Sequence, residues 1–181
     1  SALVVPLSTL YVAAALWSIA FSAGSAWLTF VVLAVMVAAA VRALLVVIND
    51  PRRESVPDWV VRLERRTVGL YAGWATIAGF INFASAVADQ GLAEAASVGW
   101  QWAVLAVALV ALLALLWASR GALGVAVAAI WALVGVLVAV GTDSTLLAVL
   151  CALGIIAVAA VWMSIAYRDR RRAAGRGWSS S

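Results

Sequence analysis

The residues best suited to chemistry lie in one otherwise apolar segment, "GLYAGWATIAGFINFASA", residues 69–86. Tyr71, Trp74, Ala78 and Asn82 are spaced three, four and four residues apart, so a helix places them on one face. Such a face can hold a flat apolar ligand. The phenol and the indole offer ring surfaces, the alanine leaves a gap between larger side chains, and the amide offers a polar contact. The alternative is that Asn82 hydrogen-bonds to another helix as a structural clamp. In either case we expect Asn82 to face the protein interior, because an amide is costly in hydrocarbon.

A second stripe of the same segment consists of small residues. Gly69 and Gly73 form a GxxxG pair, and Thr76 and Gly79 extend it along an adjoining face. Small residues let a neighbouring helix approach closely within a membrane. We therefore predict a helix-packing face next to the face that is suited to a ligand.

Tryptophan is abundant, with ten in 181 residues. Several lie near the ends of apolar stretches, where membrane proteins place an interfacial aromatic belt. Trp17 lies deeper, where its indole N–H needs a hydrogen-bond acceptor and its ring face suits a flat ligand. Packing alone is the simpler explanation for any one deep tryptophan.

Missing residue types exclude several functions. The chain has no His, which excludes an ordinary His-based metal site and the common catalytic triads. It has no Gly-rich phosphate loop, and no ionisable residue lies at mid-depth of an apolar stretch, as ion coupling would need. We therefore predict no enzyme activity, no metal, no covalently bound cofactor and no nucleic-acid partner.

The composition predicts a membrane protein, since 67% of the residues are hydrophobic and 11% are charged. The apolar stretches are about 20 residues long, which is enough for a helix to cross a bilayer. We predict an all-α polytopic bundle of six spans whose sequence neighbours are antiparallel. The spans cover about residues 3–22, 26–48, 67–88, 99–119, 122–140 and 145–167.

Arginine predicts the orientation. It occurs between spans two and three, between spans four and five, and after span six, while the other connections carry only acidic charges. By the positive-inside rule both chain ends are cytoplasmic, as in a protein of a bacterial inner membrane. We also predict an interfacial amphipathic helix at about 56–66, capped by Ser55, and a fraying basic tail at 168–181. The arginines of the interfacial helix can contact anionic lipid headgroups, although marking orientation is their simpler role.

At Tyr71, Trp74, Ala78 and Asn82 the sequence resembles the tryptophan-rich sensory protein family, also called TspO/MBR or translocator-protein-like. The last helix of that fold typically reads Tyr-x-x-Trp-x-x-x-Ala-x-x-x-Asn. Upstream, Trp17 fits the family's third-helix pattern. The resemblance covers about residues 8–88 and is to the longer bacterial branch. It implies further helices before Ser1 and places residues 99–167 beyond the compact five-helix fold.

The resemblance implies non-covalent binding of a flat hydrophobic molecule, such as a tetrapyrrole (porphyrin) or a sterol-like lipid, for sensing or transport. It implies Tyr71 and Trp74 as aromatic contacts beside Ala78, Asn82 as the polar contact, and Trp17 as a further one. Two other interpretations stay open. One is a noncatalytic subunit that docks its small-residue faces onto a partner protein or a second copy, and the other is a small-solute transporter. Membrane lipids are expected partners in every case.

Overall fold

The computed structural model describes residues 2–49, 56–92, 97–140 and 144–176 of the chain. These residues form helices and turns, with no strand among them. In hydrocarbon a helix satisfies all of its backbone hydrogen bonds internally, which is why apolar stretches of this length become helical. The helices are α1 (Val4–Ser22), α2 (Ala26–Asn49), α3 (Asp58–Asp89), α4 (Val98–Ala118), α5 (Leu123–Val140) and α6 (Thr145–Arg176).

The predicted helical membrane bundle is confirmed. Each of the six predicted spans corresponds to one helix. Five of these helices are long and apolar enough to cross a membrane, and the sixth, α5, contains a shorter apolar stretch, Leu123–Ala139.

The prediction of a separate interfacial helix at about 56–66 is wrong. Helix α3 begins at Asp58, directly after Pro57, and continues without a break through the apolar segment. No Gly or Pro occurs between Trp59 and Val68, so nothing in the sequence ends the helix before the membrane. The proposed cap Ser55 lies outside the described residues.

The first part of the basic tail is helical, because α6 continues to Arg176. Its extension meets no glycine until Gly175. The Arg171 guanidinium lies 4.7 Å from the centre of the Tyr167 ring, one helical turn earlier.

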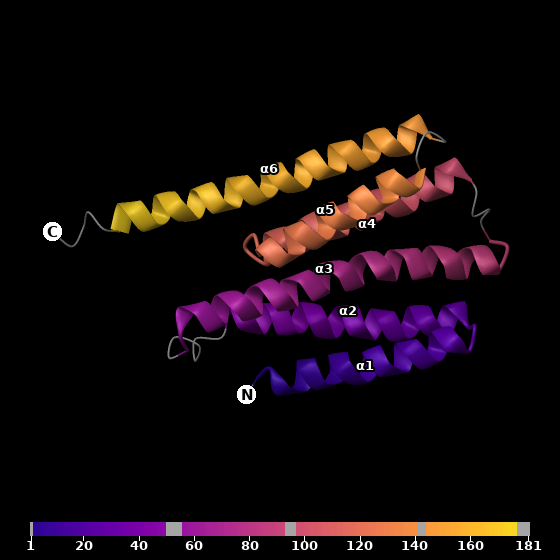
Figure 1. Cartoon of the computed structure of the whole chain (residues 1–181), viewed down its shortest axis with the longest axis horizontal. Coiled ribbons are helices and arrows are strands. Elements are labelled where there is room, and N and C mark those ends of the chain that lie inside the picture. Colours follow the sequence, from indigo (N-terminus) through magenta and orange to yellow (C-terminus); the bar gives the residue numbers. More distant parts are fainter. Residues whose placement is uncertain (1, 50–55, 93–96, 141–143, 177–181) are drawn as a thin grey trace.

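Helix α3 is central to the bundle (Figure 1). It packs against α2 on one side and against α5 and α4 on the other; α1 packs against α2, and α6 against α5 and α4. The start of α1 and the end of α6 lie at the same end of the bundle (Figure 1). One buried apolar cluster draws on all six helices, through residues such as Leu10, Leu33, Ala72, Leu112, Val125 and Val158.

Glycine allows α3 to approach the beginning of α5 very closely. A Cβ added at Gly124 would overlap the Arg66 carbonyl oxygen and the Leu70 backbone nitrogen. One turn further along, a Cβ at Gly73 would lie 2.7 Å from the Ala128 Cβ. The two backbones therefore touch without side chains between them, which is possible only with glycine at these positions.

We predict that Gly124→Ala lowers the free energy of unfolding by about 1–3 kcal/mol, the usual cost of overpacking a tight contact. The added methyl would force α5 away from α3. Thermal unfolding of the purified protein in detergent measures the effect.

The matched control is Gly135→Ala in the same helix, where an added Cβ has no atom within 4 Å. Alanine favours a helix over glycine, so this variant should keep or raise the Tm. Equal Tm values for the two variants would contradict the backbone contact.

Candidate functional site

The small-residue stripe of α3 faces two neighbouring helices. Gly69 and Gly73 are buried against α5, whereas a Cβ at Gly79 would lie 3.6 Å from Val37 of α2. Thr76 is buried between them, and its hydroxyl donates to the Ala72 carbonyl oxygen at 2.8 Å. This stripe is therefore occupied by packing within the chain.

The aromatic stripe has a different environment. Tyr71 and Trp74 form an edge-to-face pair, with ring centroids 5.6 Å apart and planes at 64°. Tyr71 is half-buried against the apolar cluster, as is Ala78, while Trp74 is 45% exposed. The structure thus leaves aromatic surface open beside a small residue on the outer side of α3.

Asn82 is half-buried at the far end of this stripe. Its Nδ2 donates to the Ala78 carbonyl oxygen at 2.9 Å, within its own helix. The described residues provide no other hydrogen bond to this amide, so it does not clamp α3 to a neighbour there. Its oxygen and second N–H are left for another partner.

Trp17 lies on α1, which runs parallel to α3 on the other side of α2 (Figure 1). Its ring stacks on Phe21 with centroids 5.5 Å apart, and it packs against the same apolar cluster as Tyr71 and Ala78. The Trp17 indole Nε1 is buried, and no acceptor for it exists among the described residues. A buried N–H without an acceptor is costly, which makes it a candidate ligand contact.

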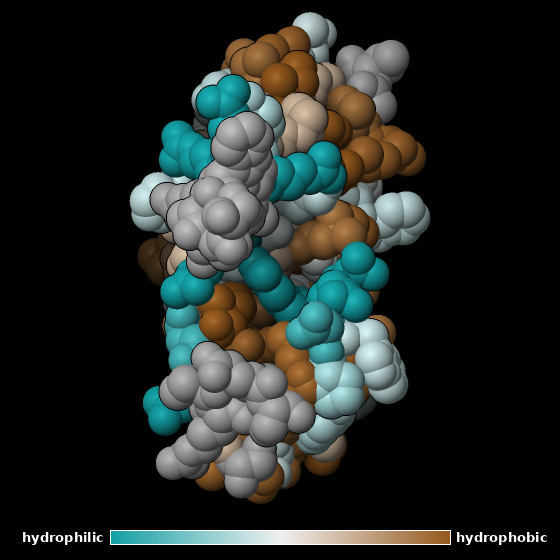
Figure 2. Space-filling model, turned by 90° about the vertical axis from the view of Figure 1, so that its left-hand side faces the viewer, coloured by the Kyte–Doolittle hydropathy of each residue, from teal (hydrophilic) through white to brown (hydrophobic). Residues whose placement is uncertain are grey.

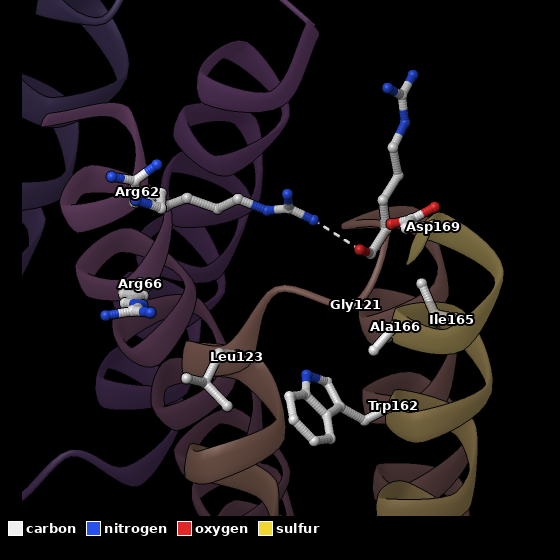
Figure 3. Close-up of a pocket in the computed structure, with 10 residues that line it drawn as sticks. Arg62, Arg66, Gly121, Leu123, Trp162, Ile165, Ala166 and Asp169 are labelled. Carbon is white, nitrogen blue, oxygen red and sulfur yellow. Dashed lines mark hydrogen bonds between the residues drawn. The ribbon is translucent and has the colours of Figure 1, made fainter. Parts of the chain in front are cut away.

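A cavity of about 250 Å³ lies at the end of the bundle where α3 begins and α6 ends. Figure 2 shows this end face-on, with hydrophilic side chains gathered over it and hydrophobic ones between them. None of the predicted ligand contacts lines the cavity. Its arginines were expected chiefly to mark orientation, with contact to anionic lipid headgroups as the alternative for those at about 56–66. Its lining consists of Arg62, Arg65, Arg66, Arg120, Gly121, Leu123, Trp162, Ile165, Ala166 and Asp169 (Figure 3).

Arg65 builds one wall of this cavity by holding the α4–α5 turn. Its Nη2 donates to the carbonyl oxygens of Ser119 at 2.8 Å and of Arg120 at 2.6 Å. These carbonyls end α4, where a helix has unpaired acceptors and partial negative charge. The turn itself needs left-handed backbone at Arg120 (φ 51°) and Gly121 (φ 70°).

We predict that Arg65→Gln lowers the free energy of unfolding by about 1.5–3 kcal/mol, because it removes charge-assisted hydrogen bonds from the turn. Arg66→Gln is the matched control, since Arg66 is exposed and has no hydrogen bond or ion pair among the described residues. Thermal unfolding in detergent compares the two. Similar Tm values would mean that Arg65 does not hold the turn.

We predict that Asn82→Ala changes the free energy of unfolding by less than about 1 kcal/mol, because the lost hydrogen bond lies within one helix and alanine favours helix. The same thermal measurement applies. A much larger loss would show that Asn82 bridges two helices after all.

Comparison with known proteins relates this chain to one protein family. A family model described as TSPO-like protein matches residues 2–165. The match extends well beyond residues 8–88 and reaches into all six helices, so α4 to α6 are part of the related region. No curated protein and no solved structure matches the chain.

Proposed function

The chain belongs to the TSPO-like protein family, and on this basis we propose that it binds a flat hydrophobic ligand within the membrane. The family and the five long apolar helices make it an integral membrane protein of a broadly ligand-binding or sensory kind. A porphyrin or a sterol-like lipid has the flat apolar shape that suits the aromatic stripe of α3.

One observation carries this proposal: neighbouring helices cover the small-residue stripe of α3, whereas they leave part of the aromatic stripe exposed. Gly69 and Gly73 are buried against α5, but the Tyr71–Trp74 pair keeps an open aromatic surface, with Trp74 45% exposed. Flat ligands bind such surfaces through stacking and apolar burial. The small Ala78 leaves room beside the rings.

Two polar groups, one at the end of this stripe and one on α1 beyond α2, have hydrogen-bonding capacity that the described residues do not use. One is the Asn82 amide, and the other is the buried Trp17 indole N–H. A ligand carboxylate or hydroxyl is a suitable partner for either group. Because the stripe lies outside the cavity at the basic end, we propose that the ligand arrives sideways from the lipid.

The alternative role as a docking subunit is less well supported. The glycines proposed for docking are occupied by α5 and α2 of the same chain.

We also propose that the Arg-rich end faces the cytoplasm of a bacterial inner membrane. Arginines of two segments, α3 and the α4–α5 turn, line one cavity there, as the positive-inside rule expects of segments on one side of the membrane.

The test is titration of the full chain in detergent with protoporphyrin IX, followed by the Soret band and by tryptophan fluorescence. We expect saturable quenching and a Soret shift. Trp74→Leu should weaken binding about tenfold, because it removes a stacking surface worth roughly 1.4 kcal/mol.

The matched control is Trp131→Leu on α5, where the tryptophan is 77% exposed and lies on another helix. Its affinity should equal that of the wild type. Asn82→Ala, if it folds with an unchanged Tm, reports the polar contact separately. An unshifted Soret band in the wild type, or equal losses in Trp74→Leu and Trp131→Leu, would refute the proposal.

A further inference from the structure

The cavity at the basic end combines cationic and apolar walls in one space. Arg62, Arg65 and Arg66 come from α3, and Arg120 comes from the α4–α5 turn. Among the described lining residues Asp169 is the one carboxylate. We infer that this cavity binds the phosphate-bearing headgroup of an anionic membrane phospholipid. It shares no residue with the aromatic stripe, so the inference stands apart from the proposed function.

The arginines are available for a ligand to different degrees. Arg66 makes no hydrogen bond or ion pair with any described residue, and Arg62 lies 4.0 Å from an exposed Asp58 carboxylate. An exposed pair of this kind is weak, so Arg62 can turn to a phosphate at little cost. Guanidinium groups bind phosphate oxygens through paired N–H donors, which favours a phosphate over a single-atom anion.

Arg65 is already oriented for such a ligand. Its Nη2 is fixed by the Ser119 and Arg120 carbonyl oxygens, and this fixes the whole guanidinium plane. Its Nε is buried and has no acceptor among the described residues. A buried cationic N–H with no acceptor is a place where a phosphate oxygen would relieve a cost.

The other walls explain why a lipid is favoured over a water-soluble phosphate. Leu123, Trp162, Ile165 and Ala166 give the cavity an apolar side, and the Trp162 indole projects from α6 towards Leu123 of α5 (Figure 3). The α4–α5 turn closes this side against α6, since a Cβ at Gly121 would lie 3.0 Å from Ile165 Cγ2. A phospholipid places its phosphate at the arginines and the start of its acyl chains on the apolar side.

Isothermal titration of the detergent-solubilised full chain with short-chain lipids tests the inference. We expect dioctanoyl phosphatidylglycerol to bind at least ten times more tightly than dioctanoyl phosphatidylcholine or inorganic phosphate, with affinity falling as salt rises. The double variant Arg62→Gln/Arg66→Gln should lose at least tenfold in affinity. Both side chains are exposed, so we expect its Tm to be unchanged.

Two further variants sharpen the result. Asp169→Asn removes the negative charge from the lining and should tighten phosphatidylglycerol binding several-fold. Arg168→Gln removes one positive charge at an exposed arginine outside the lining; it is the control for non-specific charge effects and should bind as the wild type does.

Three results would overturn the inference. They are equal binding of the two lipids, an Arg168→Gln loss as large as that of the double variant, or inorganic phosphate binding as tightly as phosphatidylglycerol. The last result would assign the cavity to a water-soluble phosphate instead.

Discussion

The bundle depends on the direct backbone contact between α3 and α5. In lipid, apolar side chains gain little by leaving one apolar surface for another, so helices associate through close packing and polar contacts. Gly124 and Gly73 let the two backbones touch, and the contact lies next to the α4–α5 turn. This proximity brings Arg65 to the turn carbonyls, and hence forms the cavity with α6.

The spans could be predicted from sequence because a membrane imposes a length and an apolar composition on any helix that crosses it. The helix ends could not be predicted in the same way. Hydropathy changes at the bilayer surface, whereas helical hydrogen bonds continue as long as no breaker intervenes. This is why α3 starts at Asp58 and α6 runs to Arg176, well outside the apolar stretches.

The two candidate sites also differ in how far the sequence alone predicts them. Helical spacing alone predicts that the residues from Tyr71 to Asn82 share one face. It does not predict the hydrogen-bond partner of the Asn82 amide, because the amide could bond either to Ala78 of its own helix or to a neighbouring helix. The arginine cavity depends on long-range proximity: Arg65 bonds to residues 54 and 55 positions away in the sequence. Positive-inside reasoning assigned these arginines to one side of the membrane but gave no distances between them.

Helices α3 and α6 each have 32 residues. At about 1.5 Å per residue each is roughly 48 Å long, well beyond a hydrocarbon core of about 30 Å. Their extensions project at the same end of the bundle (Figure 1). Because both extensions are continuous with membrane spans, the depth of the arginines relative to the lipid surface is fixed by the length of the apolar stretches. Bilayer thickness would therefore determine how far these arginines are immersed among the headgroups.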